Sequence, residues 1–283
     1  MARSRGVYWC RANSPTEHGV CWLNWNLTGL SGRLSVSSEA ITEDTLLGGK
    51  VSLFQPKAGF RAGTDSVLLA ASLADLSLKG GQIAEFGCGA GGALFPAMYH
   101  LPDASFTGVE RDVDMLALAA RNAAENSVSE RLKLVEADIQ TVARVNENQF
   151  DLVFSNPPYF EAGKIAGPGR GKEGAYVEEV TLDDWLKAML FVAKPRAHIV
   201  LIHRAAELAR ILARLDRQAG EITVMPIRPY PGAEANRILV SARKGLRSGR
   251  VRLLAGLDIY QAKGGANTDR AEAALLGKSL NWV

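Results

Sequence analysis

Four consecutive residues, Asn156-Pro157-Pro158-Tyr159, combine groups that can hold a flat amine. They follow directly on the apolar residues 150–155, which read as a short strand. The prolines end that strand, because proline donates no hydrogen bond to a sheet and keeps its predecessor extended. The Asn156 amide and the Pro157 carbonyl supply two acceptors for amine N–H groups, and Tyr159 supplies a stacking face. The exocyclic amine of adenine is the natural candidate ligand.

A second cluster, Glu85-Phe86-Gly87-Cys88-Gly89-Ala90-Gly91, lies at the end of an earlier predicted strand. Its three glycines allow a tight turn whose backbone touches a ligand, where any side chain would obstruct the approach. The spacing Gly87-x-Gly89-x-x-Gly92 also matches a dinucleotide-binding loop, so spacing alone does not exclude a nicotinamide cofactor. Glu85 favours another ligand, because its carboxylate would repel a pyrophosphate and attract a cationic sulfonium and amino group.

Two further acids end the next two predicted strands. Glu110 is placed to accept both hydroxyls of a ribose, and Asp138 to accept the exocyclic N–H of an adenine. Each acid alone is better explained as a solvated loop carboxylate. Because Glu85, Glu110, Asp138 and Asn156 end successive strands in order, chance explains the set poorly.

The elements that must position these groups alternate between strands and helices. Strands are expected at residues 82–86, 105–110, 132–137, 150–155, 197–202, 222–228 and 237–242, with helices ending at Tyr99 and covering 115–125, 182–193 and 205–217. This alternation predicts an α/β fold with a doubly wound, mostly parallel, seven-stranded Rossmann-like sheet. The last two strands have no helix between them, which predicts an antiparallel pair at one edge.

The front of the chain differs from the rest. Residues 1–41 hold three of the five tryptophans and show no helical or strand periodicity, so we expect a poorly ordered extension or a start assigned too far upstream. Residues 42–283 then form one domain. Within it, residues 50–56 read as a strand or hairpin arm, and Thr64-Asp65 can cap a helix that begins there.

Composition excludes several classes of protein. Cys10, Cys21 and Cys88 lack the spacing of a zinc site and are odd in number, which favours a reducing cytoplasm over a disulfide framework. No apolar run is long enough to span a membrane, and no metal is expected. The net charge of +3 is too small to argue for nucleic acid, but residues 227–263 carry eight Lys or Arg against two acids. These basic residues could extend a phosphate track or form a solvated face.

The motifs at residues 85–91, 110, 138 and 156–159 resemble those of class I S-adenosylmethionine-dependent methyltransferases, in the branch that methylates amino groups. More narrowly, three segments are similar to a bacterial family of tRNA adenine-N6 methyltransferases that modifies the adenosine beside the anticodon of a valine tRNA. These segments are residues 42–50, residues 55–56 with 59–69, and residues 237–245.

The resemblance implies S-adenosylmethionine as cofactor and tRNA as partner, and we expect a monomer. It implies that Glu85, Gly87, Gly89 and Gly91 surround the methionine end of the cofactor, that Glu110 holds its ribose and Asp138 its adenine, and that Thr64 and Asp65 close over its amino-acid part. Asn156 and Pro157 would orient the target amine. Tyr159 would stack on the base, with Phe160 as a second wall, and the glycine-rich residues 161–179 would fold over RNA.

Other functions remain open at this stage. A glutamine-N5 protein methyltransferase uses the same tetrad, but that class generally carries a helical amino-terminal domain that residues 1–80 lack. An adenine methyltransferase of rRNA or DNA is a further alternative, although no target-recognition domain for DNA is evident. A nicotinamide oxidoreductase or a non-catalytic adaptor would leave the prolines and the aromatic residue of the tetrad unexplained.

Overall fold

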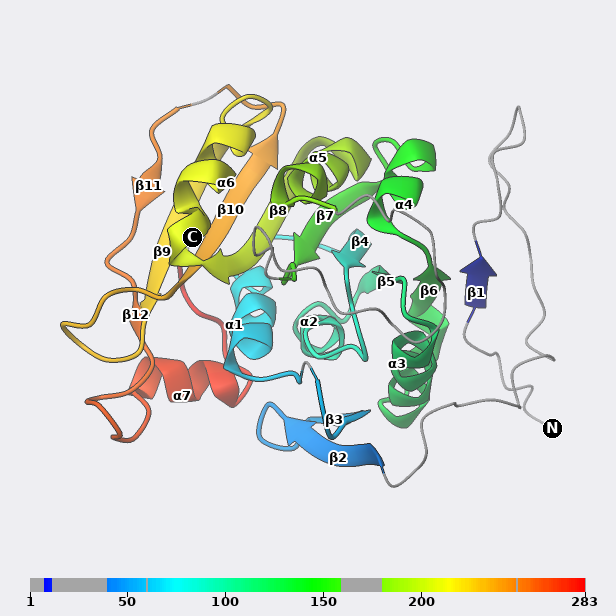
Figure 1. The fold of residues 1–283 in the computed structure, drawn as a ribbon, viewed down its shortest axis with the longest axis horizontal. Coiled ribbons are helices and arrows are strands. Elements are labelled where there is room, and N and C mark those ends of the chain that lie inside the picture. The colour runs from blue at the N-terminus through cyan, green and yellow to red at the C-terminus, as the bar shows by residue number, and fades with distance from the viewer. Residues whose placement is uncertain (1–7, 12–39, 60, 159–179, 248, 283) are drawn as a thin grey trace, which may run out of the picture.

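One ten-stranded sheet crosses the protein (Figure 1). The computed structural model describes residues 8–11, 40–59, 61–158, 180–247 and 249–282. From one edge to the other, the strands are β1 (Tyr8–Arg11), β6 (Leu132–Glu136), β5 (Ala104–Glu110), β4 (Gly81–Phe86), β7 (Phe150–Ser155), β8 (Ala193–Arg204), β10 (Arg237–Lys244), β9 (Ala219–Arg228) and β11 (Arg252–Leu253), with β12 (Leu257–Asp258) also paired to β9.

The seven strands from β6 to β9 confirm the predicted mostly parallel sheet. Strands β6, β5, β4, β7 and β8 pair in parallel, whereas β10 is antiparallel to both β8 and β9. The predicted antiparallel pair is β10 and β9, and the short strands β11 and β12 add to the outer side of β9 in parallel. The sequence analysis missed these two-residue strands.

The structure also corrects the expectation for the front segment at one point. Residues 8–11, read as part of an extension without strand periodicity, form β1, which pairs in parallel with β6. An edge strand needs only backbone hydrogen bonds to join a sheet, so it can form without an alternating pattern of side chains. Residues 1–7 and 12–39 lie outside the described residues.

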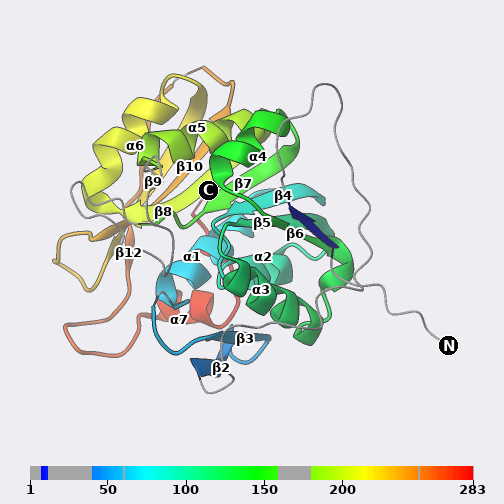
Figure 2. The same ribbon diagram turned by 45° about the vertical axis from the view of Figure 1, so that its right-hand side comes forward.

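Helices cover both faces of the sheet (Figures 1 and 2). One face carries α1 (Thr64–Leu73), α2 (Leu94–His100), α3 (Val113–Glu125) and α7 (Asp269–Leu275), and the other carries α4 (Ile139–Val145), α5 (Leu182–Val192) and α6 (Leu208–Leu215). Neighbouring residues of β7 enter different cores, Leu152 on the α1 side and Val153 on the α5 side. Burial on both faces explains why this strand reads as a continuous apolar run.

A two-stranded hairpin, β2 (Ile41–Leu46) and β3 (Val51–Pro56), packs beside α3 (Figure 1). Asn122 of α3 and Asn126 at its C-terminal cap bond the backbone of β3 as a neighbouring strand would. Asn122 accepts from the Phe54 N–H at 2.7 Å and donates to the Phe54 carbonyl at 2.9 Å, and Asn126 makes the same pair of bonds with Ser52. The hairpin is thereby fixed against the main domain.

Within the described ranges, no helix is both long enough and apolar enough to cross a membrane.

Candidate active site

The glycine loop that follows β4 has a backbone that only glycine adopts easily. Gly87, Gly89 and Gly91 have φ angles of 69°, 53° and 97°, in the left-handed region where a side chain is strained. A Cβ at Gly91 would collide with the Phe95 ring. At Gly89, by contrast, an added Cβ would meet nothing within 4 Å, so this is the side of the loop that is open to a ligand.

The loop is held in place from neighbouring strands. The N–H groups of Gly87 and Cys88 both donate to the Val109 carbonyl of β5, at 2.8 and 3.1 Å. From α3, the Asn122 amide donates to the Ala90 carbonyl at 2.9 Å. Asn122 is fully buried and serves the hairpin and the glycine loop at once, a role that the sequence analysis missed.

Glu110, the last residue of β5, faces this loop. Its Oε2 accepts from the Gly89 N–H at 3.0 Å, and its Oε1 accepts from the N–H groups of Arg111 and Asp112 at 2.8 and 3.0 Å. Three backbone donors fix the carboxylate, and no cationic side chain among the described residues pairs with it. Glu110 therefore has its carboxylate held in one orientation at the mouth of the glycine loop.

Glu85 is the most unusual ionisable group of the site. Its side chain is 2% exposed, and its Oε2 has no hydrogen-bond partner within the described part of the chain. Burial, together with the nearby Glu110 carboxylate, raises the pKa of Glu85 well above its ordinary value. A buried, unpaired carboxyl group beside a second carboxylate is suited to a cationic ligand, because a positive charge would stabilise its ionised form.

Asp138 follows β6 at the same edge of the sheet. Its Oδ1 accepts from the Gln140 N–H at 2.8 Å, so the residue caps α4. The neighbouring Ala137 N–H donates to the Glu110 carbonyl at 3.0 Å, which holds the ends of β5 and β6 together. The structure therefore brings Asp138 close in the fold to Glu110.

Asn156 comes directly after β7, one strand from the glycine loop. Its half-buried side chain makes no hydrogen bond to any described residue, so both the oxygen and the NH2 group of the amide are available. Pro157 is buried and Pro158 is exposed. Tyr159, Phe160 and residues 161–179, which the sequence analysis singled out, lie outside the described residues.

Thr64 and Asp65 begin α1 but do not cap it. The N-cap of α1 is Gly63, which makes no side-chain capping bond, so the prediction of a Thr64-Asp65 cap is wrong. Asp65 forms a 2.8 Å ion pair with Arg237 of β10. The start of α1 still borders the site, since a Cβ at Gly92 would collide with Ala62.

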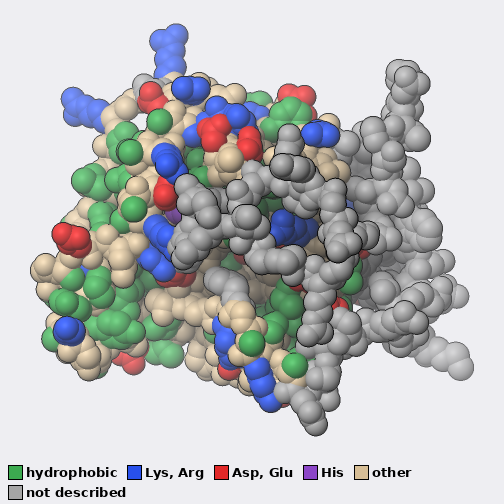
Figure 3. Space-filling view, in the orientation of Figure 1, with side chains coloured by type: hydrophobic (Ala, Val, Ile, Leu, Met, Phe, Trp, Pro, Cys, Tyr) green, Lys and Arg blue, Asp and Glu red, His purple; other side chains and the backbone are tan. Residues whose placement is uncertain are grey.

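Four of the eight basic residues at 227–263 are engaged within the protein. Arg228 pairs with Asp258 at 2.6 Å, Arg237 with Asp65, and the Lys244 ammonium donates to the Ala193 carbonyl at 2.8 Å. On the face seen in Figure 3, basic and acidic side chains are interspersed over the described residues. The other four, Arg247, Arg250, Arg252 and Lys263, are exposed.

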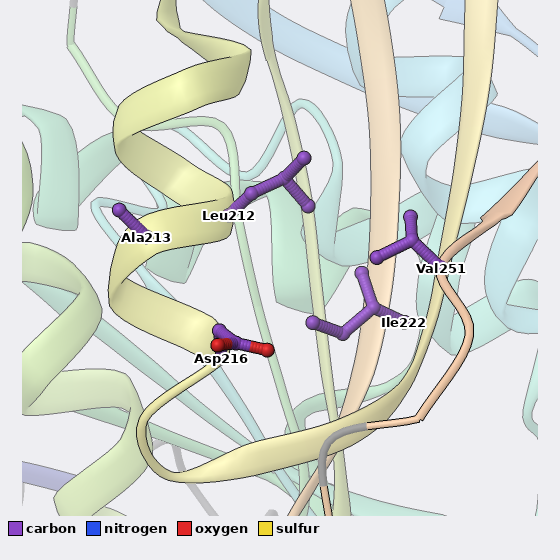
Figure 4. A pocket seen from close by; sticks show the side chains of 5 residues that line it. All are labelled: Leu212, Ala213, Asp216, Ile222 and Val251. Atoms are coloured by element: carbon purple, nitrogen blue, oxygen red, sulfur yellow. The ribbon is translucent and has the colours of Figure 1, made fainter.

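The described residues hold no cluster of metal ligands, and a shallow pocket lies away from this site. Across the described ranges, no three His, Cys, Asp or Glu side chains gather as a metal ion would require. A shallow pocket of about 220 Å³ lies between the end of α6 and the start of β9, lined by Leu212, Ala213, Asp216, Ile222 and Val251 (Figure 4). It is mostly apolar and opens at the amino edge of the sheet, opposite Asn156.

Comparisons with known proteins agree with this geometry. The family model described as the methyltransferase small domain matches residues 60–167. The tRNA1(Val) (adenine(37)-N6)-methyltransferase of Yersinia pseudotuberculosis is 32% identical over 191 residues, which span 65% of this chain and 73% of that protein. The chain belongs to the tRNA1(Val) (adenine(37)-N6)-methyltransferase family. The member of this family from Mannheimia succiniciproducens is 30% identical over 154 residues, 53% of this chain and 62% of that protein.

Solved structures show that this member of the family has the class I methyltransferase fold. A predicted O-methyltransferase from Agrobacterium tumefaciens has a TM-score of 0.63 and 27% identity, over 76% of this chain and 97% of that one. A 16S rRNA N2 G1207 methyltransferase from T. thermophilus, in complex with AdoMet and guanosine, has a TM-score of 0.52 and 15% identity, over 72% of this chain and 50% of that one. The second likeness concerns the fold alone.

Proposed function

We propose that this protein methylates the N6 amino group of an adenosine in tRNA, with S-adenosylmethionine as methyl donor. The observation that carries the proposal is the position of Asn156-Pro157-Pro158 at the carboxyl end of β7. There the Asn156 amide is one strand from the glycine loop and is not bonded to any described residue. Family membership supports the substrate class, because the relatives are named for tRNA adenine methylation.

The residues of the site fit this donor. The open side of Gly89 leaves room for its methionine end, and the unpartnered Oε2 of Glu85 suits a cationic group. Glu110 would accept the ribose hydroxyls, and the Asp138 carboxylate would take the adenine amine. When bound, S-adenosylmethionine would supply the methyl group; the nitrogen–methyl bond would form as the sulfur–methyl bond breaks, and the nitrogen would then lose one proton to solvent.

Asn156 and Pro157 would prepare the target nitrogen. The lone pair of an adenine amine is delocalised into the ring, which makes the nitrogen a poor nucleophile. The Asn156 side-chain oxygen and the Pro157 carbonyl would each accept one N–H, which favours a pyramidal nitrogen and directs its lone pair at the methyl carbon. Positioning and electrostatics then lower the barrier. Tyr159 would stack on the base.

The most suitable substrate is an adenosine in a loop. A base must leave its stack to reach a pocket at a sheet edge, and this costs less in a loop than in a duplex. We place the target beside the anticodon, in the anticodon loop, in line with the names of the relatives. Because the substrate is tRNA, we expect the protein to act in the cytoplasm. We also expect it to act as a monomer.

The test is mass spectrometry of nucleosides from total tRNA incubated with the protein and isotope-labelled S-adenosylmethionine. We expect labelled N6-methyladenosine. A synthetic anticodon stem-loop is then compared with a matched one in which inosine, which lacks the exocyclic amine, replaces the adenosine beside the anticodon; only the first should gain label. Label in a release factor or ribosomal protein, with none in tRNA, would replace the proposal with the glutamine-N5 alternative, and label confined to rRNA or DNA would change the substrate.

A further inference from the structure

Two arginines stand opposite each other at the edge of the sheet that carries Asn156. Arg204 is the last residue of β8 and Arg237 is the first residue of β10, and the register of these antiparallel strands makes them direct partners. Ser155 of β7 is paired with Leu201 of β8, so Arg204 lies three residues further toward this edge, beside the segment that begins at Asn156. The two arginines therefore belong to the rim of the candidate active site.

Both arginines lie on the face of the sheet that carries α1. Side chains two residues apart on a strand share a face, and both Ile202 of β8 and Leu239 of β10 are packed in the core on the α1 side. Asp65 of α1 agrees with this direction, because its carboxylate pairs with Arg237 at 2.8 Å. Helix α1 lies beside the carboxyl end of β8 in both views of the fold (Figures 1 and 2). The arginine pair is therefore on the same face as α2, the helix that follows the glycine loop.

The positions of these two side chains favour an anionic ligand. Like charges that are directly opposite on two strands repel each other and weaken the pairing. The Asp65 carboxylate offsets part of this repulsion, and the Nη1 of Arg237 also donates to the Asn236 carbonyl at 3.1 Å. The Arg237 side chain is still 26% exposed and Arg204 is half-buried, so solvent reaches both. A phosphate group suits such a pair, because its oxygens accept parallel hydrogen bonds from a planar guanidinium group and its charge counteracts the repulsion.

We propose that Arg204 and Arg237 bind a phosphate of the RNA strand close to the target adenosine. This inference rests on the proposed function, because it assigns a backbone contact to the RNA whose base enters at Asn156. Neighbouring strands are about 4.8 Å apart, so β8 and β10 lie about 5 and 10 Å from β7, within reach of a phosphate near the target. Phosphate contacts fix the position of a nucleic acid without reading its sequence. The arginine pair holds the loop in place, whereas the Asn156 segment selects the base.

The first experiment measures binding of the synthetic anticodon stem-loop to the full chain without cofactor. Arg204→Gln and Arg237→Gln each remove one guanidinium group, and each should raise the Kd about tenfold, as for the loss of a hydrogen bond to a charged group. The slope of log Kd against log salt concentration should fall by about 0.7 in each variant, as for one lost phosphate contact. Arg252→Gln makes the same change on the exposed strand β11, away from this edge, and is the matched control that should keep both values.

A second experiment separates a phosphate contact from a structural role of the ion pair. Asp65→Asn removes the partner of Arg237 and leaves both arginines in place, so stem-loop binding should be kept or strengthened. The phosphates that flank the target adenosine are also replaced, one at a time, by neutral methylphosphonates. One replacement should weaken binding to the wild type and have a smaller effect on the two arginine variants, because both changes remove the same contact.

Several results would overturn the proposal. These are unchanged binding in Arg204→Gln and Arg237→Gln, an equal loss in Arg252→Gln, and a loss in Asp65→Asn as large as that in Arg237→Gln. Methylphosphonates that weaken binding to the wild type and to the arginine variants equally would also overturn it, as would arginine changes that weaken binding of a protein substrate alone. A wild type that methylates no RNA, while the arginine changes still weaken stem-loop binding, would instead overturn the proposed function.

Discussion

The indole Nε1–H of Trp185 donates a 2.9 Å hydrogen bond to the hydroxyl of Ser155, which in turn donates to the Phe86 carbonyl at 2.7 Å. Ser155 is the last residue of β7 and Phe86 the last residue of β4. The relay therefore ties together the two strand ends that carry Asn156 and the glycine loop. The Trp185 ring also lies under Gly87, where an added Cβ would approach it to 3.1 Å.

Removing the Ser155 hydroxyl should destabilise the protein. Ser155→Ala takes away the acceptor of the Trp185 indole and a donor to Phe86 in a fully buried place, so we expect the free energy of unfolding to fall by about 1–3 kcal/mol. Trp185→Phe should cost a similar amount. In urea denaturation, the double variant should lose less than the sum of the single losses, by about 1 kcal/mol, because both changes break the same bond. Full additivity would mean that the two residues are not coupled.

Asn122 should matter to both stability and cofactor binding. Asn122→Ala breaks two bonds to Phe54 and one to Ala90 of the glycine loop, so we expect a loss of about 3 kcal/mol in unfolding free energy. Binding of S-adenosylhomocysteine, measured by calorimetry, should also weaken. Asn126→Ala is the control, because Asn126 bonds Ser52 of the same hairpin and makes no bond to the loop. Equal weakening of S-adenosylhomocysteine binding in both variants would contradict this role of Asn122.

Glu85 should make the cofactor-free protein less stable as pH rises. Burial raises its pKa in the folded state above the ordinary value of 4.5, so its contribution to stability is complete below pH 4.5 and is lost as pH rises through the folded-state pKa. The side chain of Glu85→Gln cannot ionise, so the free energy of unfolding of this variant should rise relative to that of the wild type as pH rises. Urea unfolding from pH 5 to pH 8 measures this difference. A difference independent of pH would show that Glu85 does not titrate as described.

The parts of the fold that could be predicted from the sequence are those that residues adjacent in the chain determine. The glycine loop, the strand-ending acids and the prolines after β7 are each set by neighbouring residues, because turn chemistry and strand termination are local. Helices α4 and α7 were missed, since each has only seven residues, about two turns, which show little helical period. The equally short α2 was predicted from its place between the glycine loop and the next strand.

The parts of the site that sequence could not predict depend on contacts between distant residues. Asn122 meets Phe54 across 68 positions and Trp185 meets Ser155 across 30. Nothing in the local sequence of these residues indicates a partner. The same is true of Asp65, whose place at a helix start predicted a cap, whereas its carboxylate binds Arg237 across 172 positions.

The most direct test of the central claim, that the amine is methylated at the end of β7, is a paired measurement on Asn156→Ala. The variant and the wild type are compared for labelled N6-methyladenosine formed in tRNA and for the Kd of S-adenosylhomocysteine. We predict a loss of turnover of about 100-fold or more, as when a preorganised transition-state contact is removed, with the Kd nearly unchanged. Turnover retained in Asn156→Ala would contradict the account.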